Sequence, residues 1–315
     1  MSVEVIARAC CSAANLGSGF DVIALALDAF YDEVKVHVVE STEPSVELVN
    51  ISGPYSEGVS KELNTAVKAI EYFLKEKEVS TRVEVELWKG IPVGKGLGGS
   101  GASAAAAVKA ISTALELEVS PEEAVRIAGF GEIVSAGTVH YDNVSASYLG
   151  GLAIVFSTDP LEVFSLKPGG DVEFILAIPK VATPPRKTEF MRKVLPKSIP
   201  LEKHVHNSGR LAALLIGFVN GDANIIGTGM RDAIVEPARA PYIPAYQRVK
   251  EYALEAGAKG VAVSGAGPSM IILAGKSSER ICEAVRKAYE DEGIEVDLKV
   301  TKPAPGARII KRSSF

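Results

Sequence analysis

The chain has 315 residues and a formal net charge of −5, and 47% of its residues are hydrophobic. This length predicts one large or two ordinary domains with a sizeable core, and the negative charge argues against nucleic acid or an anionic membrane as the main partner. Three cysteines are too few for a disulfide framework, and the residues show no signal-peptide or transmembrane pattern. We therefore expect a cytoplasmic protein.

The first half of the chain alternates strand and helix patterns. Val34, Val36 and Val38 alternate with polar residues, as in a half-buried strand, whereas apolar residues between Leu63 and Leu74 recur at helical spacing. The elements predicted for this half are strands at 34–38, 46–51, 83–87 and 152–156 and helices at 63–74, 101–115 and 121–135.

The second half begins near Asp171 and interleaves short apolar strands with longer helical patterns. The elements predicted here are strands at 174–178, 261–264, 270–273 and 295–300 and helices at 207–219, 242–256 and 278–291. This order predicts an α+β sandwich of the ferredoxin-like type, with helices covering one sheet.

A glycine-rich stretch from Pro92 to Ser103 separates a predicted strand from a predicted helix. Four of the six residues from Gly94 to Gly99 are glycine, which lets backbone N–H groups approach an anion closely. The helix N-terminus adds further N–H donors and partial positive charge, so the stretch predicts a phosphate site. A tight turn is the alternative, but it needs only one or two glycines. The predicted nucleotide-binding residues of this stretch are Pro92, Val93, Gly94, Lys95, Gly96, Leu97, Gly98, Gly99, Ser100, Gly101, Ala102 and Ser103.

Two familiar phosphate patterns fit this stretch poorly. The P-loop pattern is absent because Lys95 is followed by glycine. Gly94, Gly96 and Gly99 satisfy the dinucleotide pattern, which requires a second strand about 20 residues later. Ser120 and Pro121 instead begin a helix there, so a dinucleotide-dependent oxidoreductase is only an alternative hypothesis.

The stretch resembles the phosphate-binding motif of the GHMP kinase family, whose pattern is Pro-x-x-x-Gly-Leu-Gly-Ser-Ser-Ala. Five positions match, namely Pro92, Gly96, Leu97, Gly98 and Ser100. Gly99 and Gly101 depart from it, and both changes make the side chain smaller. The resemblance implies a GHMP kinase fold, with a mixed α/β ATP-binding domain over residues 1–165 and a ferredoxin-like domain over residues 166–315. The active site is then expected between the two domains.

The segment from Ser12 to Asp21 is similar to a motif of homoserine kinases within this family, with one extra small residue before Asn15. Asn15 offers both a donor and an acceptor, and the carboxylate of Asp21 can pair with a substrate ammonium. The alternative is an Asn-Gly turn in which Asp21 caps a helix.

Further residues are assigned by the same resemblance. Ser100 and Glu132 are expected to bind Mg²⁺, a hard cation that prefers oxygen ligands, and Asn64 is expected to contact adenine. His140, Asn143 and Thr188 are expected to line the substrate pocket, and Arg192 and Arg239 to clamp a carboxylate. Taken singly, these residues have structural explanations, such as a helix cap for Asn64 or a surface ion pair for either arginine. The catalytic residues predicted are Ser100, Glu132, Asn143 and Arg192. Ser264 to Ser269 matches a C-terminal glycine motif that borders the active site in this family.

The resemblance implies ATP- and Mg²⁺-dependent phosphorylation of the side-chain hydroxyl of L-homoserine, a step of threonine biosynthesis. No clear general base is apparent, and a loose phosphoryl-transfer transition state can do without one. A GHMP kinase for another alcohol and a non-catalytic amino-acid-binding module are two further hypotheses. The sequence leaves the oligomeric state open, a homodimer being the assembly considered.

Overall fold

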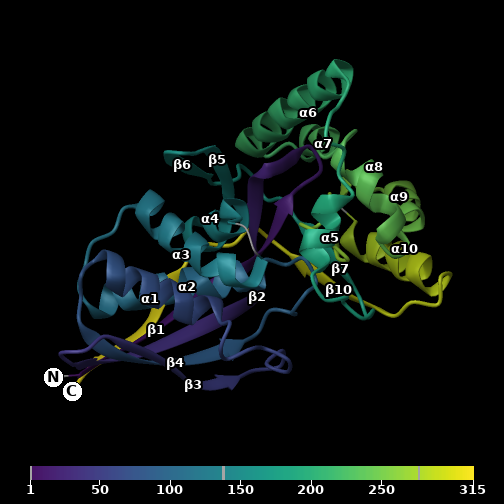
Figure 1. Ribbon diagram of the computed structural model, residues 1–315. Coiled ribbons are helices and arrows are strands. Elements are labelled where there is room, and N and C mark those ends of the chain that lie inside the picture. The colour runs from purple at the N-terminus through teal and green to yellow at the C-terminus, as the bar shows by residue number, and fades with distance from the viewer. Residues whose placement is uncertain (1, 137–138, 276) are drawn as a thin grey trace.

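A computed structural model describes residues 2–136, 139–275 and 277–315 of the chain (Figure 1). The described strands form two sheets, one of seven strands and one of four. Helices cover each sheet, and the N- and C-terminal ends of the chain lie close together (Figure 1). No described helix combines the length and the apolar character needed to cross a lipid bilayer.

The first half of the chain contains the larger sheet and the helices that pack on it. In chain order its elements are β1 (Ser2–Asn15), β2 (Gly19–Glu40), β3 (Ser45–Ser52), α1 (Thr65–Glu76), β4 (Thr81–Lys89), α2 (Gly99–Ala114), α3 (Pro121–Ala136), α4 (Tyr141–Leu149), β5 (Leu152–Thr158) and β6 (Leu161–Leu166). The sheet runs β11-β1-β2-β4-β3, with β5 pairing both β2 and β6. The added strand β11 (Arg308–Ser314) comes from the end of the chain and pairs antiparallel with β1.

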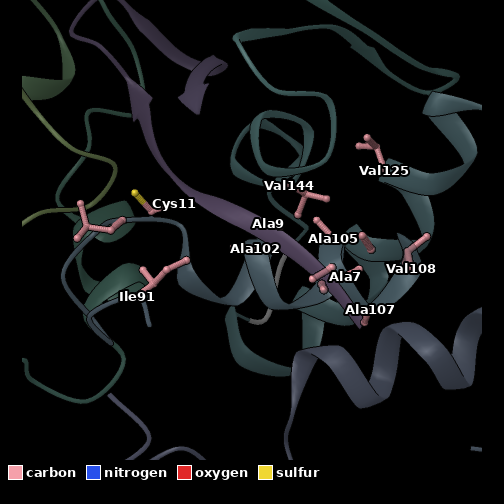
Figure 2. Packing of buried hydrophobic residues seen from close by; sticks show 14 of the residues in the cluster. Ala7, Ala9, Cys11, Ile91, Ala102, Ala105, Ala107, Val108, Val125 and Val144 are labelled. Carbon is pink, nitrogen blue, oxygen red and sulfur yellow. The ribbon is translucent and has the colours of Figure 1, made fainter. Parts of the chain in front are cut away.

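Small side chains allow α2 to pack closely against this sheet. Residues 104–107 are four consecutive alanines, all fully buried. Figure 2 shows Ala102, Ala105 and Ala107 of α2 beside Ala7 and Ala9 of β1. Because a helix without bulky side chains can approach a strand closely, this packing fixes the position of the α2 N-terminus relative to the sheet.

The second half contains the smaller sheet. Its elements are β7 (Phe174–Pro179), α5 (Lys187–Lys193), α6 (Leu201–Asn220), α7 (Ala223–Gly229), α8 (Val235–Arg239), α9 (Tyr246–Glu255), β8 (Gly260–Val263), β9 (Met270–Leu273), α10 (Ser278–Glu290) and β10 (Val296–Thr301), with a short 3₁₀ turn at Ala240–Tyr242. The strand order is β10-β7-β9-β8, with every neighbouring pair antiparallel. Numbered within this half, that order is fourth, first, third, second, which confirms the predicted ferredoxin-like sandwich.

The sequence prediction missed some elements and shortened others. The strand predicted at 34–38 is the end of β2, which begins at Gly19, and β1 was not predicted. The last seven residues of β1 are all buried, so they show none of the alternation that identifies a strand. β6, α4, α5, α7, α8 and β11 were also missed. The division at residues 165/166 stays a prediction, and β11 returns to the first sheet across it.

Helix α6 is held to the protein by few buried side chains. Leu214, Gly217 and Phe218 are its buried residues, and the ring of Phe218 stacks on that of Phe174 in β7 at 6.2 Å between centroids. Most of the remaining surface of this helix is exposed. Phe218 and Leu214 are therefore the large apolar side chains that anchor α6.

We predict that Phe218→Ala lowers the free energy of unfolding by about 3–5 kcal/mol, because it removes a fully buried ring and leaves a cavity. The matched control is Ile216→Ala on the same helix, where the side chain is 54% exposed, and we expect a change within about 0.5 kcal/mol. Urea denaturation followed by circular dichroism measures both. Equal losses in the two variants would contradict the anchoring role of Phe218.

Candidate active site

A cavity of about 670 Å³ lies where segments from both halves of the chain meet. Its walls include the loop between β4 and α2, the turn between β1 and β2, the beginning of α4, and α5. The turn between β8 and β9 completes the lining with Gly265 and Ala266. Segments far apart in sequence therefore converge on one cavity.

The loop from residue 90 to residue 98, here called the glycine loop, ends at an uncapped helix N-terminus. Gly98 is the N-cap of α2 with φ of 64°, and no side chain accepts a hydrogen bond from the first turn of this helix. A Cβ on Gly98 would lie 2.1 Å from Ser12 Oγ and 2.8 Å from Asn143 Oδ1, so the position admits only glycine. The first N–H groups of α2 are left for a ligand, and such groups bind anions well.

A buried ion pair holds the glycine loop from behind. Lys89, the last residue of β4, donates to Asp32 and also to Ser103 Oγ at 3.1 Å, and both charged side chains are almost fully buried. The second oxygen of Asp32 accepts from the backbone N–H groups of Gly90 at 3.0 Å and Ile91 at 3.1 Å. The network therefore joins β2, β4, the loop and α2, while the front of the loop faces the cavity.

The turn between β8 and β9, here called the 264–269 hairpin, packs against the glycine loop. Ser264 Oγ donates to Gly96 O at 2.7 Å, and a Cβ on Gly96 would lie 2.4 Å from Ser264 O. The backbone N–H of Gly265 donates to Ala14 O at 3.1 Å. These contacts connect the two halves of the chain directly beside the cavity.

Ser100 and Glu132 form a hydrogen-bonded pair at the cavity wall. Ser100 Oγ, in the first turn of α2, donates to Glu132 Oε1 of α3 at 2.6 Å. Burial raises the pKa of Glu132 to about 7, and the nearby carboxylate of Asp142 adds to the shift. Burial likewise raises the pKa of Asp142 to about 6. Both buried carboxyl groups thus lie at the cavity wall, where a bound cation would stabilise their ionised forms.

Asp21 and Arg192 form a bidentate ion pair across the cavity. The two guanidinium nitrogens lie 2.9 and 3.0 Å from the two carboxylate oxygens. Arg192 Nη2 also lies 2.9 Å from His140 Nδ1, which must accept because a guanidinium only donates. Burial and the charge of Arg192 lower the pKa of His140, which favours the neutral ring that this contact needs. Arg192 Nε is buried and has no acceptor among the described residues.

Asn15 and Arg239 are anchored by backbone groups beside this pair. Asn15 Nδ2 donates to Gly265 O at 3.1 Å and its Oδ1 accepts from the N–H of Asp21 at 3.2 Å. Arg239 donates to Met191 O at 3.1 Å and Gly265 O at 3.0 Å, and burial lowers its pKa to about 10. Asn15 therefore positions Asp21, and Arg239 brings a positive charge close to the same region.

Comparisons with known proteins agree with this geometry. Residues 64–151 match the family model of the GHMP kinases N terminal domain, and residues 214–291 match that of the GHMP kinases C terminal domain. The homoserine kinase of Aeropyrum pernix is 45% identical over 308 residues, which cover 96% of this chain and 97% of the relative. That of Pyrobaculum neutrophilum is 41% identical, with 95% and 98% covered. The chain belongs to the GHMP kinase family.

Solved structures of GHMP kinases support the same conclusion. The crystal structure of a homoserine kinase from Cytophaga hutchinsonii superposes with a TM-score of 0.89 and 32% identity, covering 98% of this chain and 97% of the other. A mevalonate kinase of L. major, solved with R-mevalonate, has a TM-score of 0.67 at 15% identity. The latter likeness concerns the fold alone. The predicted fold class is therefore confirmed.

The structure of this GHMP kinase brings most of the predicted site residues to one cavity. Those that line it are Asn15, Asp21, Asn64, Pro92, Val93, Gly94, Lys95, Gly96, Leu97, Gly98, Gly99, Ser100, Ser103, Glu132, His140, Asn143, Thr188, Arg192 and Arg239. Gly101 and Ala102 are buried in α2 behind it. Asn64 also caps α1, accepting from the N–H groups of Ala66 and Val67. Their roles toward ligands stay predictions.

Five further charged residues line the cavity but were not assigned to it from sequence: Lys89, Asp142, Arg186, Lys187 and Glu189. Asp142 directly precedes Asn143, which is expected from the family resemblance to line the substrate pocket, so this neighbouring position was the available signal. Lys89 ends the strand before the glycine loop. No sequence pattern singles out Lys187.

We predict that Lys89→Met lowers the free energy of unfolding by about 3–5 kcal/mol, because it leaves the Asp32 carboxylate buried without its partner. The double variant Asp32→Asn/Lys89→Met removes both charges and is expected to recover part of the loss. Lys180→Met, which breaks an exposed ion pair with Glu295, is the control and should change stability by less than about 1 kcal/mol. Chemical denaturation measures all three, and a Lys89→Met loss as small as that of the control would contradict the role of this pair.

Proposed function

We propose that this GHMP kinase transfers the terminal phosphoryl group of ATP to the side-chain hydroxyl of L-homoserine. The observation that supports this most directly is the arrangement of one cavity. An uncapped helix N-terminus with a glycine loop lies on one wall, and the Asp21–Arg192 pair with Arg239 lies on another. The first suits a polyphosphate, and the second suits a zwitterionic amino acid.

The glycine loop fits the phosphates of ATP. Positions where a Cβ would collide, such as Gly96 and Gly98, leave the backbone bare at the cavity wall. The N–H groups at the beginning of α2 would donate to phosphate oxygens, and Asn64 at the beginning of α1 lines the same cavity. ATP supplies the phosphoryl group when bound there.

Ser100 and Glu132 fit a magnesium ion. Their oxygen atoms are already 2.6 Å apart, and both belong to the hard donor class that Mg²⁺ prefers. Among the residues described, no cluster of three or more acidic, histidine or cysteine side chains could enclose a metal by itself. This agrees with an ion held by one carboxylate, a hydroxyl and nucleotide phosphates, where it would neutralise phosphate charge.

The polar wall fits the amino and carboxylate groups of homoserine. Asp21 would pair with the ammonium. Its backbone is held in position because its N–H donates to Asn15 Oδ1. Arg192 and Arg239 would bind the carboxylate, and the unpartnered Nε of Arg192 is a donor that such a carboxylate could satisfy. Because Asp21 and Arg192 form a bidentate pair, homoserine would divide this pair between its two charged groups.

His140, Asn143 and Thr188 complete the acceptor side. Asn143 is oriented by Ser12, whose hydroxyl donates to its Oδ1 at 2.8 Å. We assign these residues to aligning the homoserine hydroxyl with the terminal phosphate. In a loose transition state such alignment, together with neutralisation of charge, supplies most of the rate, and the hydroxyl proton can pass to a phosphate oxygen or water.

The direct test is ADP release from ATP and Mg²⁺ in the presence of homoserine, mevalonate, shikimate or galactose. Turnover with homoserine at least about tenfold above that with the other alcohols is expected, since only homoserine carries the ammonium and carboxylate that the charged wall would bind. Preference for another alcohol would contradict the proposed substrate, and NAD binding without ATP turnover would contradict a kinase.

The first prediction about this function concerns Asp21. Asp21→Asn should reduce kcat/KM for homoserine by about 30-fold or more, because it removes one partner of a charged contact. It should affect the deaminated analogue 4-hydroxybutyrate much less, because that molecule has no ammonium. The measurement is the ratio of kcat/KM for the two alcohols in wild type and variant. An unchanged ratio would show that Asp21 does not recognise the ammonium.

The second prediction concerns Glu132. Glu132→Gln keeps the shape of the side chain but removes its charge, so we expect kcat to fall by about 10²-fold or more at saturating Mg²⁺. Glu202→Gln, at an exposed position of α6, is the matched control and should leave kcat unchanged. Activity of Glu132→Gln within about threefold of wild type would place the metal ligand elsewhere.

A further inference from the structure

Lys187, the first residue of α5, bridges the two halves of the chain at the cavity wall. Its ammonium donates to Gly94 O of the glycine loop at 2.7 Å and to Gly267 O of the 264–269 hairpin. The nearby Thr183 hydroxyl lies 3.4 Å from the same Gly94 oxygen. The flexible side chain of Lys187 therefore joins the beginning of α5 to both glycine-rich turns.

No carboxylate compensates this charge within the described chain. The charged groups that act on Lys187 are two other cations, Lys95 from the glycine loop and Arg239 from α8. Lys95 itself donates to the carbonyls of Pro179 and Val181, and Arg239 to those of Met191 and Gly265. Lys187 and Lys95 are thus held at the cavity by neutral carbonyl oxygens, whereas Arg239 adds a third positive charge that the carboxylates of Asp21, Asp142 and Asp232 partly offset.

Placing these cations together raises the free energy of the folded protein unless an anion binds beside them. Like charges repel one another in a partly desolvated region, and carbonyl oxygens neutralise none of the net charge. Burial, with the repulsion of Lys95 and Arg239, lowers the pKa of Lys187 to about 7. On its own segment, Arg186 adds positive charge, while Arg192 is paired with Asp21 and the carboxylate of Glu189 is paired with Lys193.

We propose that Lys187 is a phosphate-binding residue of this kinase, contacting phosphate oxygens of ATP at the glycine loop. The proposal rests on the function proposed above for this cavity. Since α5 also carries Thr188 and Arg192, a phosphate contact at its first residue would help to hold the acceptor side in place when the nucleotide is bound.

Calorimetric titration with ATP and with adenosine tests this role. Lys187→Met removes the charge at nearly constant length and should weaken ATP about 10- to 100-fold, the usual value of a charged hydrogen bond. Adenosine lacks phosphates, so its affinity should change by no more than about twofold. Lys187→Arg should retain most of the ATP affinity. The control is Lys193→Met on the same helix, whose 70% exposed side chain pairs with Glu189, and both its affinities should match wild type.

Proton uptake provides a second readout. Near pH 8 the amine of Lys187 is largely neutral in the free protein, and a bound phosphate raises its pKa, so ATP binding should take up a proton. The uptake follows from the dependence of the binding enthalpy on the buffer. It should shrink near pH 6, where Lys187 is already charged, and should be lost in Lys187→Met.

These experiments test the phosphate contact of Lys187 independently of the proposed phosphorylation of homoserine. Unchanged ATP affinity in Lys187→Met, or equal weakening of ATP and adenosine, would overturn it and leave Lys187 as a structural bridge. Should Lys187→Met fail to fold, loss of the wild-type proton uptake in Lys187→Arg, whose guanidinium is already charged at pH 8, supports the proposal, and unchanged uptake in Lys187→Arg overturns it. ATP binding by wild type without phosphorylation of homoserine would refute the proposed reaction and leave the phosphate contact standing.

Discussion

The site depends on one constraint, namely that the N-terminus of α2 has to be held firmly without being capped. A side chain at the N-cap would satisfy the free N–H groups and remove the reason for an anion to bind there. The N-cap is instead Gly98, and the rigidity comes from the buried Asp32–Lys89 pair behind the loop. The N–H groups of Gly90 and Ile91 are satisfied by Asp32, while those of the first helical turn face the cavity. The loop is thus fixed on one side and open on the other.

The charges around the cavity are arranged in an unbalanced way that complementary ligands would correct. Glu132 and Asp142 are buried carboxyl groups, and their burial raises their pKa values because it disfavours the ionised forms. Lys95, Lys187 and Arg239 are cations held by backbone carbonyls. A metal ion beside the carboxylates would stabilise their ionised forms, and a polyphosphate beside the cations would offset the repulsion between them. Strained electrostatics of this kind are common at functional sites.

Close backbone contacts between the two halves keep the acceptor side in register with the glycine loop. Gly17 in the turn after β1 has φ of 85°, and a Cβ there would lie 2.1 Å from Met230 O. The amide of Asn15 joins the same turn to Gly265 in the 264–269 hairpin. Since these contacts involve backbone atoms, they leave little freedom for one wall of the cavity to shift relative to the other.

The sequence by itself determined the elements whose residues alternate or recur with a clear period, and the glycine-rich motifs that identify the family. It located β4, α1, α2 and α3, and in the ferredoxin-like half β7 to β10, α9 and α10, to within a few residues, because one face of these elements is apolar or a capping residue marks their ends. It failed for β1 and the beginning of β2, since strands buried on both faces have no period to detect. It also named most residues that line the cavity, because they belong to short recognisable motifs.

Only the tertiary structure decided which of these residues face one another. Asp21 and Arg192 are 171 positions apart, and Lys89 and Asp32 are 57 apart, so neither ion pair is visible in a linear pattern. The bridge made by Lys187 depends on the glycine loop and the 264–269 hairpin meeting at its ammonium. Pairing, burial and pKa values are properties of a three-dimensional neighbourhood. A sequence motif supplies the chemical groups, whereas the packing of α2, α5 and the hairpin sets the distances and the solvent exposure that give those groups their charge and orientation.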